Sequence, residues 1–553
     1  MPDSGSLVLA RAREGKMCKL GTRKAVQFYG ATSLLQVPQT SSPKLASSSP
    51  LQQQQQSYGG SSMQVGGGTS SFPFSPKDEV CQRLMRNFFL DAYQHNMCIY
   101  REYFLRDYAA SGGPYYSDAL MFSICAIGSL ISPDPELRQL ASTFAAEAGS
   151  IVFESLESPD LTTLQSLILL GHLEIGQGRS SKGWLFCGMA FRLTHEMGLH
   201  LDPTNWSTNN SESESSVDRE ILRRVYWAVF LIDKQLSLYF GRPPALYPQE
   251  ADVRNTIRIP YPPEWEDLLD SYISKGTSAT AFEDGVRLVG CFIHQVELAK
   301  ISHTLIVDVF ENRHRQSDTT AAATTAHQVH TSLVRWLALL PQKLHWNQWT
   351  VGQVPPYVLH LHMLFHTCMI ILHRPPRQHW DDEAVAKGED VEICFQSLAA
   401  VLRLLKTYQR YYRFQVLPLD FVQTLSAAAE VVMLKRYVEK SAWTDKDIAK
   451  PMTQILEAME AVQEVYPCIR EIHRSLIAST QSEPIVSGPG AQEMDSLDLD
   501  LMDMLQSGAG PFPHWLADEG TPSGTVDLGF LVTDETLNDL PPWDVGSEAE
   551  LYG

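Results

Sequence analysis

The segment LTHEMGLHLD, residues 193–202, places His195 and Glu196 in the order of the zinc-protease motif H-E-x-x-H. That motif binds zinc because its two histidines, four residues apart, lie on one face of a helix and share the ion. Here the second histidine is His200, five residues on, which is about 140° around a helix. Gly198 is also expected to end the helix before it. We therefore expect the two rings to point to different sides, and we predict no zinc site.

The glycine-rich segment GQGRSSKG, residues 176–183, has the composition of a phosphate-binding loop. In a P-loop, Lys and then Ser or Thr follow the last glycine, whereas here Trp184 follows Gly183. No strand is predicted before the segment either. We interpret it as a polar turn between two helices.

Three histidines follow one stripe of a predicted helix within HLHMLFHTCMIILHRPP, residues 360–376: His362, His366 and His373, with Cys368 nearby. Neutral imidazoles arranged in this way are able to bind zinc. No carboxylate lies in the same stripe to orient the rings, and Met, Leu and Ile surround it. We therefore expect these histidines to pack within helix interfaces.

Asp233 lies in the apolar part of REILRRVYWAVFLIDKQLSLYF, between Ile232 and Leu236. A buried carboxylate usually needs a partner, and we expect that partner among the arginines Arg192, Arg224 and Arg242. We interpret Asp233 as part of a structural ion pair. The sequence has no G-x-S-x-G elbow and no obvious acid pair for glycoside chemistry. It therefore predicts no catalytic, cofactor-binding or metal-binding residue, although an α-helical enzyme stays a third, weaker alternative.

Composition and charge limit the classes of protein that fit. The 553 residues are 44% hydrophobic and 20% charged, with a net charge of −20, which disfavours nucleic-acid binding except where basic residues gather. No apolar run of about 18 residues is present, so we predict no membrane span. The nine cysteines contain no C-x-x-C pair and are scattered through apolar segments, as is typical of reduced thiols in an intracellular protein.

Amino-acid composition and the spacing of apolar residues divide the chain into three parts, and the middle part is predicted to have an all-α fold. Residues 1–76 are rich in Ser, Gly and Gln and are predicted to form a disordered basic arm, and residues 483–553 a disordered acidic tail. Residues 77–482 show apolar residues at helical spacing. The predicted helices are 78–109, 115–131, 135–156, 161–177, 181–198, 218–240, 283–311, 322–339, 355–373, 390–412, 418–439 and 446–476.

Three segments together resemble the fungal-specific transcription factor domain, the middle homology region of fungal zinc-cluster regulators. They are GRSSKGWLFCGMAFRLTHEMGLHLD (178–202), REILRRVYWAVFLIDKQLSLYFGRPPAL (219–246) and LHMLFHTCMIILHRPP (361–376). The resemblance covers most of 77–440. Its signature residues are Gly183, Trp184, Arg192, Gly198, Arg223, Arg224, Trp227, Asp233, Gly241, Arg242 and Pro243. We assign all of them structural roles.

Each part of this signature has an expected place in the packing. Small residues permit close helix approach (Gly183, Gly188, Ala190), apolar ones fill the interfaces (Trp184, Phe191, Leu193, Trp227), and Gly198 supplies a left-handed stop. Arg223 and Arg224 are expected to pair with acids on neighbouring helices.

The DNA-binding element of this family, or DNA reader, is a cluster of six cysteines that binds two zinc ions and precedes the domain in the chain. Only Cys18 precedes Cys81 here, so we expect no cofactor in this chain, and zinc only if such a cluster lies upstream. Either the start codon is assigned too late or the regulator has lost its reader. The residues left for weak, sequence-blind phosphate contact are Arg11, Arg13, Lys16, Lys19, Arg23 and Lys24.

The C-terminal part contains EMDSLDLDLMDMLQS, residues 493–507, in which acids alternate with Leu and Met. Acids keep such a segment solvated, so that its apolar groups stay available to coactivator grooves. We predict an activation region that depends on Leu497, Leu499, Leu501, Leu505 and Trp515. The alternative is a tail that is merely solvated.

The resemblance and the tail together predict a nuclear transcription regulator that controls a catabolic or secondary-metabolite gene set. Its expected partners are coactivators and DNA, the latter directly only through a restored zinc cluster or through a partner protein, with no membrane. A homodimer, a heterodimer and a small-molecule effector stay open. The alternative function is a non-DNA-binding scaffold or inhibitor that pairs with a full-length relative.

Overall fold

The computed structural model describes residues 15–20, 25–30, 72–205, 216–255, 265–311, 319–347, 349–350, 352–376, 379–380 and 382–481. Within these residues the body of the protein is helical, as the sequence predicts, and its buried apolar side chains form one continuous core. No described helix is long and apolar enough to cross a membrane.

The elements follow one another along the chain in two groups. The first group is β1 (Gly15–Leu20), β2 (Ala25–Gly30), α2 (Glu79–Asn87), η1 (Phe88–Ala92), η2 (Tyr93–His95), α3 (Arg101–Ala110), α4 (Asp118–Leu130), α5 (Pro135–Gln139), α6 (Ala141–Glu154), η3 (Ser155–Glu157), α7 (Leu161–Gly176), α8 (Ser180–Glu196), η4 (Pro203–Asn205) and α9 (Ser216–Phe240). The second is η5 (Pro248–Glu250), α10 (Trp265–Tyr272), α11 (Thr277–Thr304), η6 (Leu305–Phe310), α12 (Thr319–Ala338), η7 (Gln342–Leu344), α13 (Pro356–His373), α14 (Glu383–Ala386), α15 (Glu389–Tyr411), η9 (Phe414–Val416), α16 (Asp420–Glu439), α17 (Lys446–Val462), η10 (Pro467–Ile469) and α18 (Arg470–Gln481).

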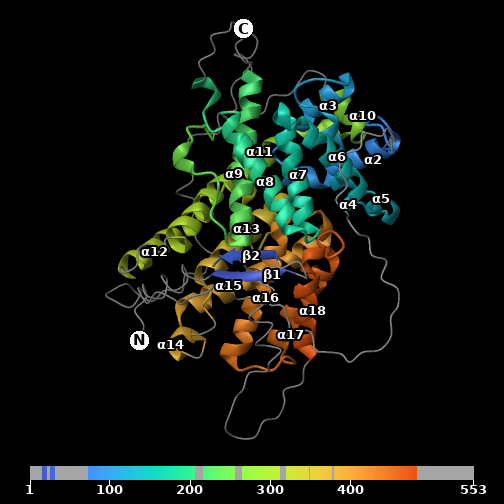
Figure 1. Ribbon diagram of the computed structural model, residues 1–553. Coiled ribbons are helices and arrows are strands. Elements are labelled where there is room, and N and C mark those ends of the chain that lie inside the picture. Colours follow the sequence, from blue (N-terminus) through green and yellow to red (C-terminus); the bar gives the residue numbers. More distant parts are fainter. Residues whose placement is uncertain are drawn as a thin grey trace.

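Helix α9 lies in the middle of this arrangement and contacts α8, α11 and α16 (Figure 1). Helices α2 to α7 pack together on one side of it, with α4 in contact with α2, α6 and α7. Helices α15 to α18 close the opposite end, and α13 joins them to the centre through α11, α15 and α16. The chain thus buries α9 between its two halves.

Some observed elements differ from the predicted ones, including the helix predicted over 446–476, which is divided into α17, η10 and α18. The helix predicted over 78–109 is interrupted, because Asn96 leaves the helical region with φ −123° and ψ 59°. Helix α10, Trp265–Tyr272, is not among the predicted helices. The arm predicted to be disordered contains the antiparallel strands β1 and β2. The strand-forming residues Val26, Phe28 and Tyr29 belong to β2, which lies near α9.

Two helices are followed by a glycine in the left-handed conformation, as predicted for Gly198. Gly198, after α8, has φ +67°, and Gly241, after α9, has φ +62°. These left-handed conformations carry a steric cost for residues with a Cβ atom. Asp160 caps α7, since its side chain accepts a hydrogen bond from the Thr163 amide at 2.8 Å.

Helices α7 and α8 approach each other more closely than side chains usually permit. A Cβ atom on Gly183 would lie 2.4 Å from the carbonyl oxygen of Gly171 and 2.5 Å from a side-chain carbon of Ile175. The predicted role of Gly183 is therefore confirmed. Gly188 was assigned the same role, and that is wrong, because nothing lies within 4 Å of a Cβ atom built there.

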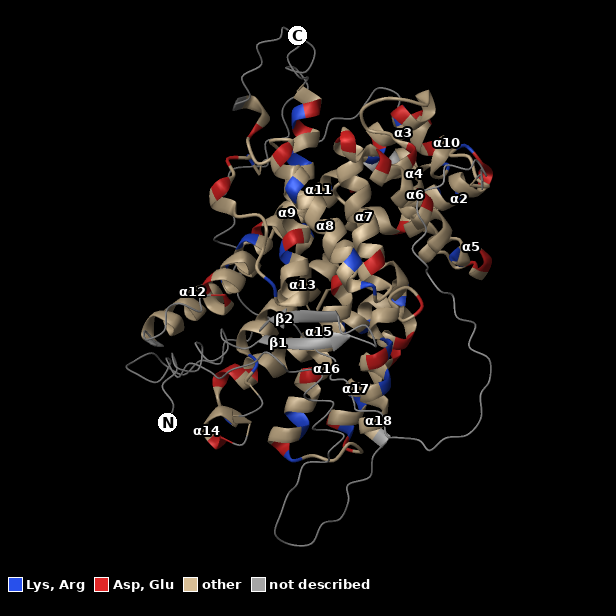
Figure 2. Cartoon of the chain, viewed as in Figure 1, with Lys and Arg blue, Asp and Glu red and all other residues tan. Residues whose placement is uncertain are grey.

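Acidic residues lie on many of the outer elements, including α5, α10 and α14 (Figure 2). This agrees with the sequence, in which residues 77–490 have a net charge of −11. A basic surface suited to the DNA backbone is therefore not a general property of the helical body.

We predict that Gly183→Ala lowers the free energy of unfolding by about 1–3 kcal/mol, because the new methyl group forces the backbones of α7 and α8 apart. Thermal unfolding followed by circular dichroism measures the change.

Gly149→Ala is the matched control. Gly149 lies inside α6, and nothing lies within 4 Å of a Cβ atom there. This change should leave stability equal or raise it by about 0.5–1 kcal/mol. Equal effects of the two changes would contradict the close approach at Gly183.

Candidate functional site

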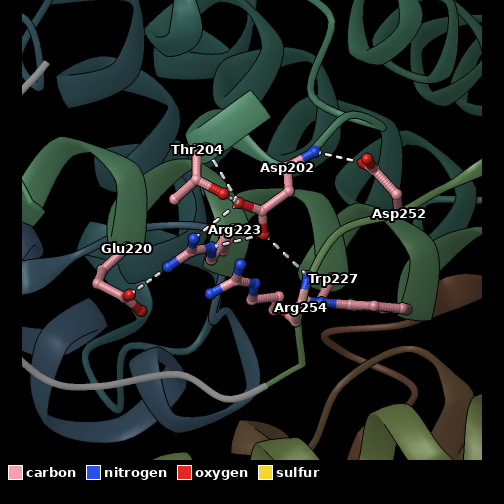
Figure 3. A network of polar contacts seen from close by, with 7 residues as sticks. All are labelled: Asp202, Thr204, Glu220, Arg223, Trp227, Asp252 and Arg254. Atoms are coloured by element: carbon pink, nitrogen blue, oxygen red, sulfur yellow. Dashed lines mark hydrogen bonds and ion pairs between the residues drawn. The ribbon is translucent and has the colours of Figure 1, made fainter. Parts of the chain in front are cut away.

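A buried carboxylate joins three segments next to the start of α9 (Figure 3). Asp202, in the turn after α8, accepts hydrogen bonds from Arg223 Nε at 2.9 Å and Nη2 at 2.7 Å. It also accepts from the backbone amides of Thr204 at 3.0 Å and Arg254 at 3.1 Å. The side chains of Asp202 and Arg223 are only 1% and 7% exposed. We call this arrangement the Asp202 clamp.

Charge pairing fixes the protonation state of the clamp. Burial by itself raises the pKa of a carboxyl group, but the hydrogen bonds from Arg223, Thr204 and the Arg254 amide together hold the pKa of Asp202 well below its usual range. Arg223 also contacts Glu220 on its own helix at 2.5 Å. The predicted pairing of Arg223 with acids is thus confirmed, although the partners lie in a turn and on α9 rather than on neighbouring helices.

Arg224 was expected to pair with an acid, and that expectation is wrong. Its guanidinium donates hydrogen bonds to the carbonyl oxygens of Met97 and Ile99 and to the Tyr93 hydroxyl, each at 2.9 Å. It also lies over the ring of Tyr100, 4.4 Å from the centroid. The chain between η2 and α3 leaves carbonyl groups without helical partners, and an arginine has enough donors to satisfy several.

Asp233 forms a buried ion pair as predicted, but with a different partner. Its Oδ2 lies 2.6 Å from Nζ of the adjacent Lys234, and its carboxylate accepts hydrogen bonds from the amides of Ala245 and Leu246, both at 2.9 Å. The expected arginine partners are therefore wrong. The turn at Gly241 and Pro243 folds the chain back along α9, which brings residues 245 and 246 to this carboxylate.

The two remaining arginines lie at the surface of α8. Arg242 stacks over the rings of Trp184 and Phe240, 4.6 and 4.5 Å from their centroids. Arg192 is exposed and points into an open apolar groove with a volume of about 450 Å³. This α8 groove is lined by Leu156, Pro159, Trp184, Leu185, Gly188, Met189, Arg192, Leu193 and Glu196.

The groove explains two sequence features that packing alone does not. Gly188 meets no neighbour because it faces this opening. Trp184 was expected to fill a helix interface and is half-buried instead. Its ring packs edge to face with that of Phe240, with centroids 5.3 Å apart, and it also lines the groove. Trp227, by contrast, is buried, and its indole N–H donates to the Arg254 carbonyl oxygen at 3.0 Å.

His195 and His200 lie closer together than their spacing predicts. Their ring centroids are 5.0 Å apart, so the expectation that the rings point to different sides is wrong. Helix α8 ends at Glu196, and the left-handed turn at Gly198 carries His200 back toward α8. Nδ1 of His195 contacts the Phe191 carbonyl oxygen at 3.2 Å. Among the described residues, no group of three or more potential ligands is arranged to hold a metal ion.

The histidines of α13 have separate partners. His362 Nε2 lies 2.9 Å from the Leu344 carbonyl oxygen, whereas His373 lies between Asp390 of α15 and His330 of α12, with 2.8 Å between the two imidazole nitrogens. Burial lowers the pKa of His362 to about 4 and that of His366 to about 3. Packing of these rings within helix interfaces is what the sequence predicted here.

Several predicted site residues fall where side chains are not described. Lys16 and Lys19 lie on β1. The others lie outside the described residues: Arg11, Arg13, Arg23, Lys24, Leu497, Leu499, Leu501, Leu505 and Trp515. Sequence reasoning missed Asp202 altogether, although Asp followed by Pro and Thr is typical of a turn in which the carboxylate accepts nearby amides.

Comparison with known proteins shows the family to which the chain belongs. Residues 85–338 match the fungal specific transcription factor domain. A transcriptional regulatory protein of Schizosaccharomyces pombe, itself uncharacterized, is 39% identical over 432 residues, which make up 77% of this chain and 68% of the relative. The chain therefore belongs to the family of fungal transcriptional regulators that contain this domain. It is a transcription regulator.

More distant relatives extend the comparison. The nitrogen assimilation transcription factor nirA of Emericella nidulans is 28% identical over 84% of this chain and 50% of its own length. Nit-4 of Neurospora crassa, with the same description, is 27% identical over 70% of this chain and 35% of its own length. Two further Schizosaccharomyces pombe regulators are matched over 62% and 63% of their length. No solved structure matches the chain.

We predict that Asp202→Asn lowers the free energy of unfolding at pH 7 by about 3 kcal/mol, because it removes the buried carboxylate that pairs with Arg223 and leaves Glu220 as the remaining acid in contact with that guanidinium. The pKa of Asp202 is lowered in the folded state, so its contribution is present above the unfolded pKa of about 4 and is lost as pH falls further. The difference between the two proteins in urea unfolding should shrink as pH falls below about 4.

The control is Glu383→Gln, which removes an exposed ion pair with Lys387. Exposed pairs contribute little, so this variant should unfold like the original protein. A difference between Asp202→Asn and the original that did not change with pH would argue against a charged clamp.

Proposed function

We propose that this chain is a nuclear transcription activator that acts by binding rather than by catalysis. Its helical domain forms the regulatory body, and its acidic C-terminal region recruits coactivators through Leu497, Leu499, Leu501, Leu505 and Trp515. The observation that carries this proposal is the run of Leu and Met among acids at 493–507, in a member of a transcription-regulator family. Residues 491–553 contain 14 Asp or Glu and no Lys or Arg.

The helical domain is proposed to hold a partner surface or a small-molecule effector, whose presence exposes or masks the activation region. The volume of the α8 groove, about 450 Å³, lies in the range of small-molecule sites. The His, Asp and Cys side chains of the core have packing partners within the protein, such as His362 with Leu344 and Asp233 with Lys234. This supports a binding function over an enzymatic one.

Contact with DNA is proposed to come from a six-cysteine zinc cluster encoded upstream of residue 1 or from a partner protein. The experiment is to read the upstream genomic sequence for an in-frame six-cysteine segment. The proposed targets are genes for nutrient use rather than a secondary-metabolite cluster, since two relatives are named for nitrogen assimilation.

We predict that residues 491–553 activate a reporter when fused to an unrelated DNA-binding domain. Changing Leu497, Leu499, Leu501 and Leu505 to Ala should abolish most of the gain, because the apolar groups that enter a coactivator groove are removed. Reporter output per fusion protein, with expression measured by immunoblot, checks this.

Four other leucines of the same region, Leu528, Leu531, Leu537 and Leu540, provide the matched control. Their change to Ala should retain most of the activity. No reporter gain from the original region, or equal losses from both sets, would contradict the proposed activation region. Tethering the whole chain to a promoter tests the alternative, since repression or silence would favour a scaffold or inhibitor.

We predict that the chain as given binds DNA only weakly and without sequence preference. Six basic residues of the arm, replaced by Ala together, should account for most of this binding: Arg11, Arg13, Lys16, Lys19, Arg23 and Lys24. Six phosphate contacts limit the slope of log K against log salt to about −5. Filter binding over a salt series measures the slope, and tight, sequence-specific binding would contradict the prediction.

A further inference from the structure

The outer face of α8, the end of α6 and η3 expose three large apolar side chains next to one another. Leu185 is 65% exposed, Phe153 52% and Leu156 37%. Leu185 and Leu156 line the α8 groove, and Phe153 packs its ring edge against Phe186 of α8, with centroids 5.7 Å apart. Large apolar side chains gathered at one exposed site are typical of surfaces that bind another segment of protein.

Three cations lie at or beside this apolar surface although the helical domain as a whole is acidic. Arg192 lines the groove, Arg242 lies over Trp184, and Lys182 lies 5.3 Å from the ring centroid of Phe186. Glu196 also lines the groove, and Lys182 is paired with Glu174. Apolar contact therefore supplies most of the binding, and the arginines favour a ligand that carries acids. The expected ligand is therefore apolar on one face and carries several acids.

One segment of this chain has these properties. In DSLDLDLMDML, residues 495–505, Leu497, Leu501, Met504 and Leu505 fall at i, i+4, i+7 and i+8, which is one face of a helix. The segment contains four aspartates and no Lys or Arg. An amphipathic helix that lays such a face into an apolar groove is a common mode of recognition.

We propose that the α8 groove binds residues 495–505 of the same chain, with the leucine face against Leu185 and Leu156 and the aspartates toward Arg192 and Arg242. This proposal rests on the proposed role of the segment in activation. Docking covers the leucines that a coactivator would contact, so the groove controls whether the activation region is available.

Chain length favours this segment over a second copy of the protein. The described chain ends at Gln481, and the 13 residues before the segment span up to about 45 Å when extended. A short tether of this kind gives an effective concentration in the millimolar range. Wherever this tether spans the distance from Gln481 to the groove, it favours occupation within one chain over binding of a second copy.

A photo-crosslinker placed at position 185 of the full chain tests the docking directly. Leu185→p-benzoylphenylalanine should yield an intramolecular cross-link that mass spectrometry maps to residues 495–505. The same group at Leu90, which is 52% exposed and does not line the groove, is the control and should not reach this segment. A dimer-sized product, or no cross-link to 495–505, would overturn the proposal.

A reporter measurement on the tethered full chain separates this proposal from the proposed function. Leu185→Asp should raise activity, about tenfold if nine-tenths of the molecules are docked, while Leu90→Asp should leave it unchanged. Circular dichroism checks that both variants fold. If the isolated region 491–553 is active but Leu185→Asp has no effect, only the docking is wrong. If the isolated region is inactive, the proposed function itself fails.

Discussion

Burial of charge on α9 is the constraint on which the rest of the structure depends. Four charged residues of α9 are at most 6% exposed as whole residues: Arg223, Arg224, Asp233 and Lys234. Charges removed from water need partners that compensate for the lost hydration. Each partner fixes a different segment: the turn after α8, the chain between η2 and α3, and the return after Gly241. The position of these segments therefore follows from the polar contacts of one helix, and apolar packing fills the space between them.

The same constraint leaves the outer face of α8 open. On its inner side, α8 is held against α7 by the close approach of Gly183 to Gly171, and its following turn is held to α9 by Asp202. Neither contact uses the face that carries Leu185 and Arg192. This face of α8 is open to other segments, because neither of the contacts that hold α8 in place depends on it.

The histidines and thiols of the interior illustrate how packing sets chemistry. Burial lowers the pKa of His362 and His366 and raises the pKa of Cys291 and Cys187, so these groups are uncharged at neutral pH. A neutral imidazole with a carbonyl partner and a neutral thiol in an apolar contact stabilise helix interfaces. Residues that suggest metal binding or catalysis in the sequence, such as His362 and Cys291, thus lie in the core as uncharged packing groups.

The sequence by itself determined the local elements. Apolar spacing located helices such as α7, α8, α9 and α13 to within about three residues, and Gly198 and Gly241 marked true left-handed stops, because helix period and backbone sterics depend on near neighbours. Only the tertiary structure decided the partners. That Arg224 binds carbonyl oxygens, that Asp233 pairs with Lys234 and two amides, and that the ring of His200 returns to that of His195 depend on where distant segments meet. The spacing of residues along the chain does not predict these long-range contacts, since each contact depends on how the whole bundle satisfies its buried polar groups.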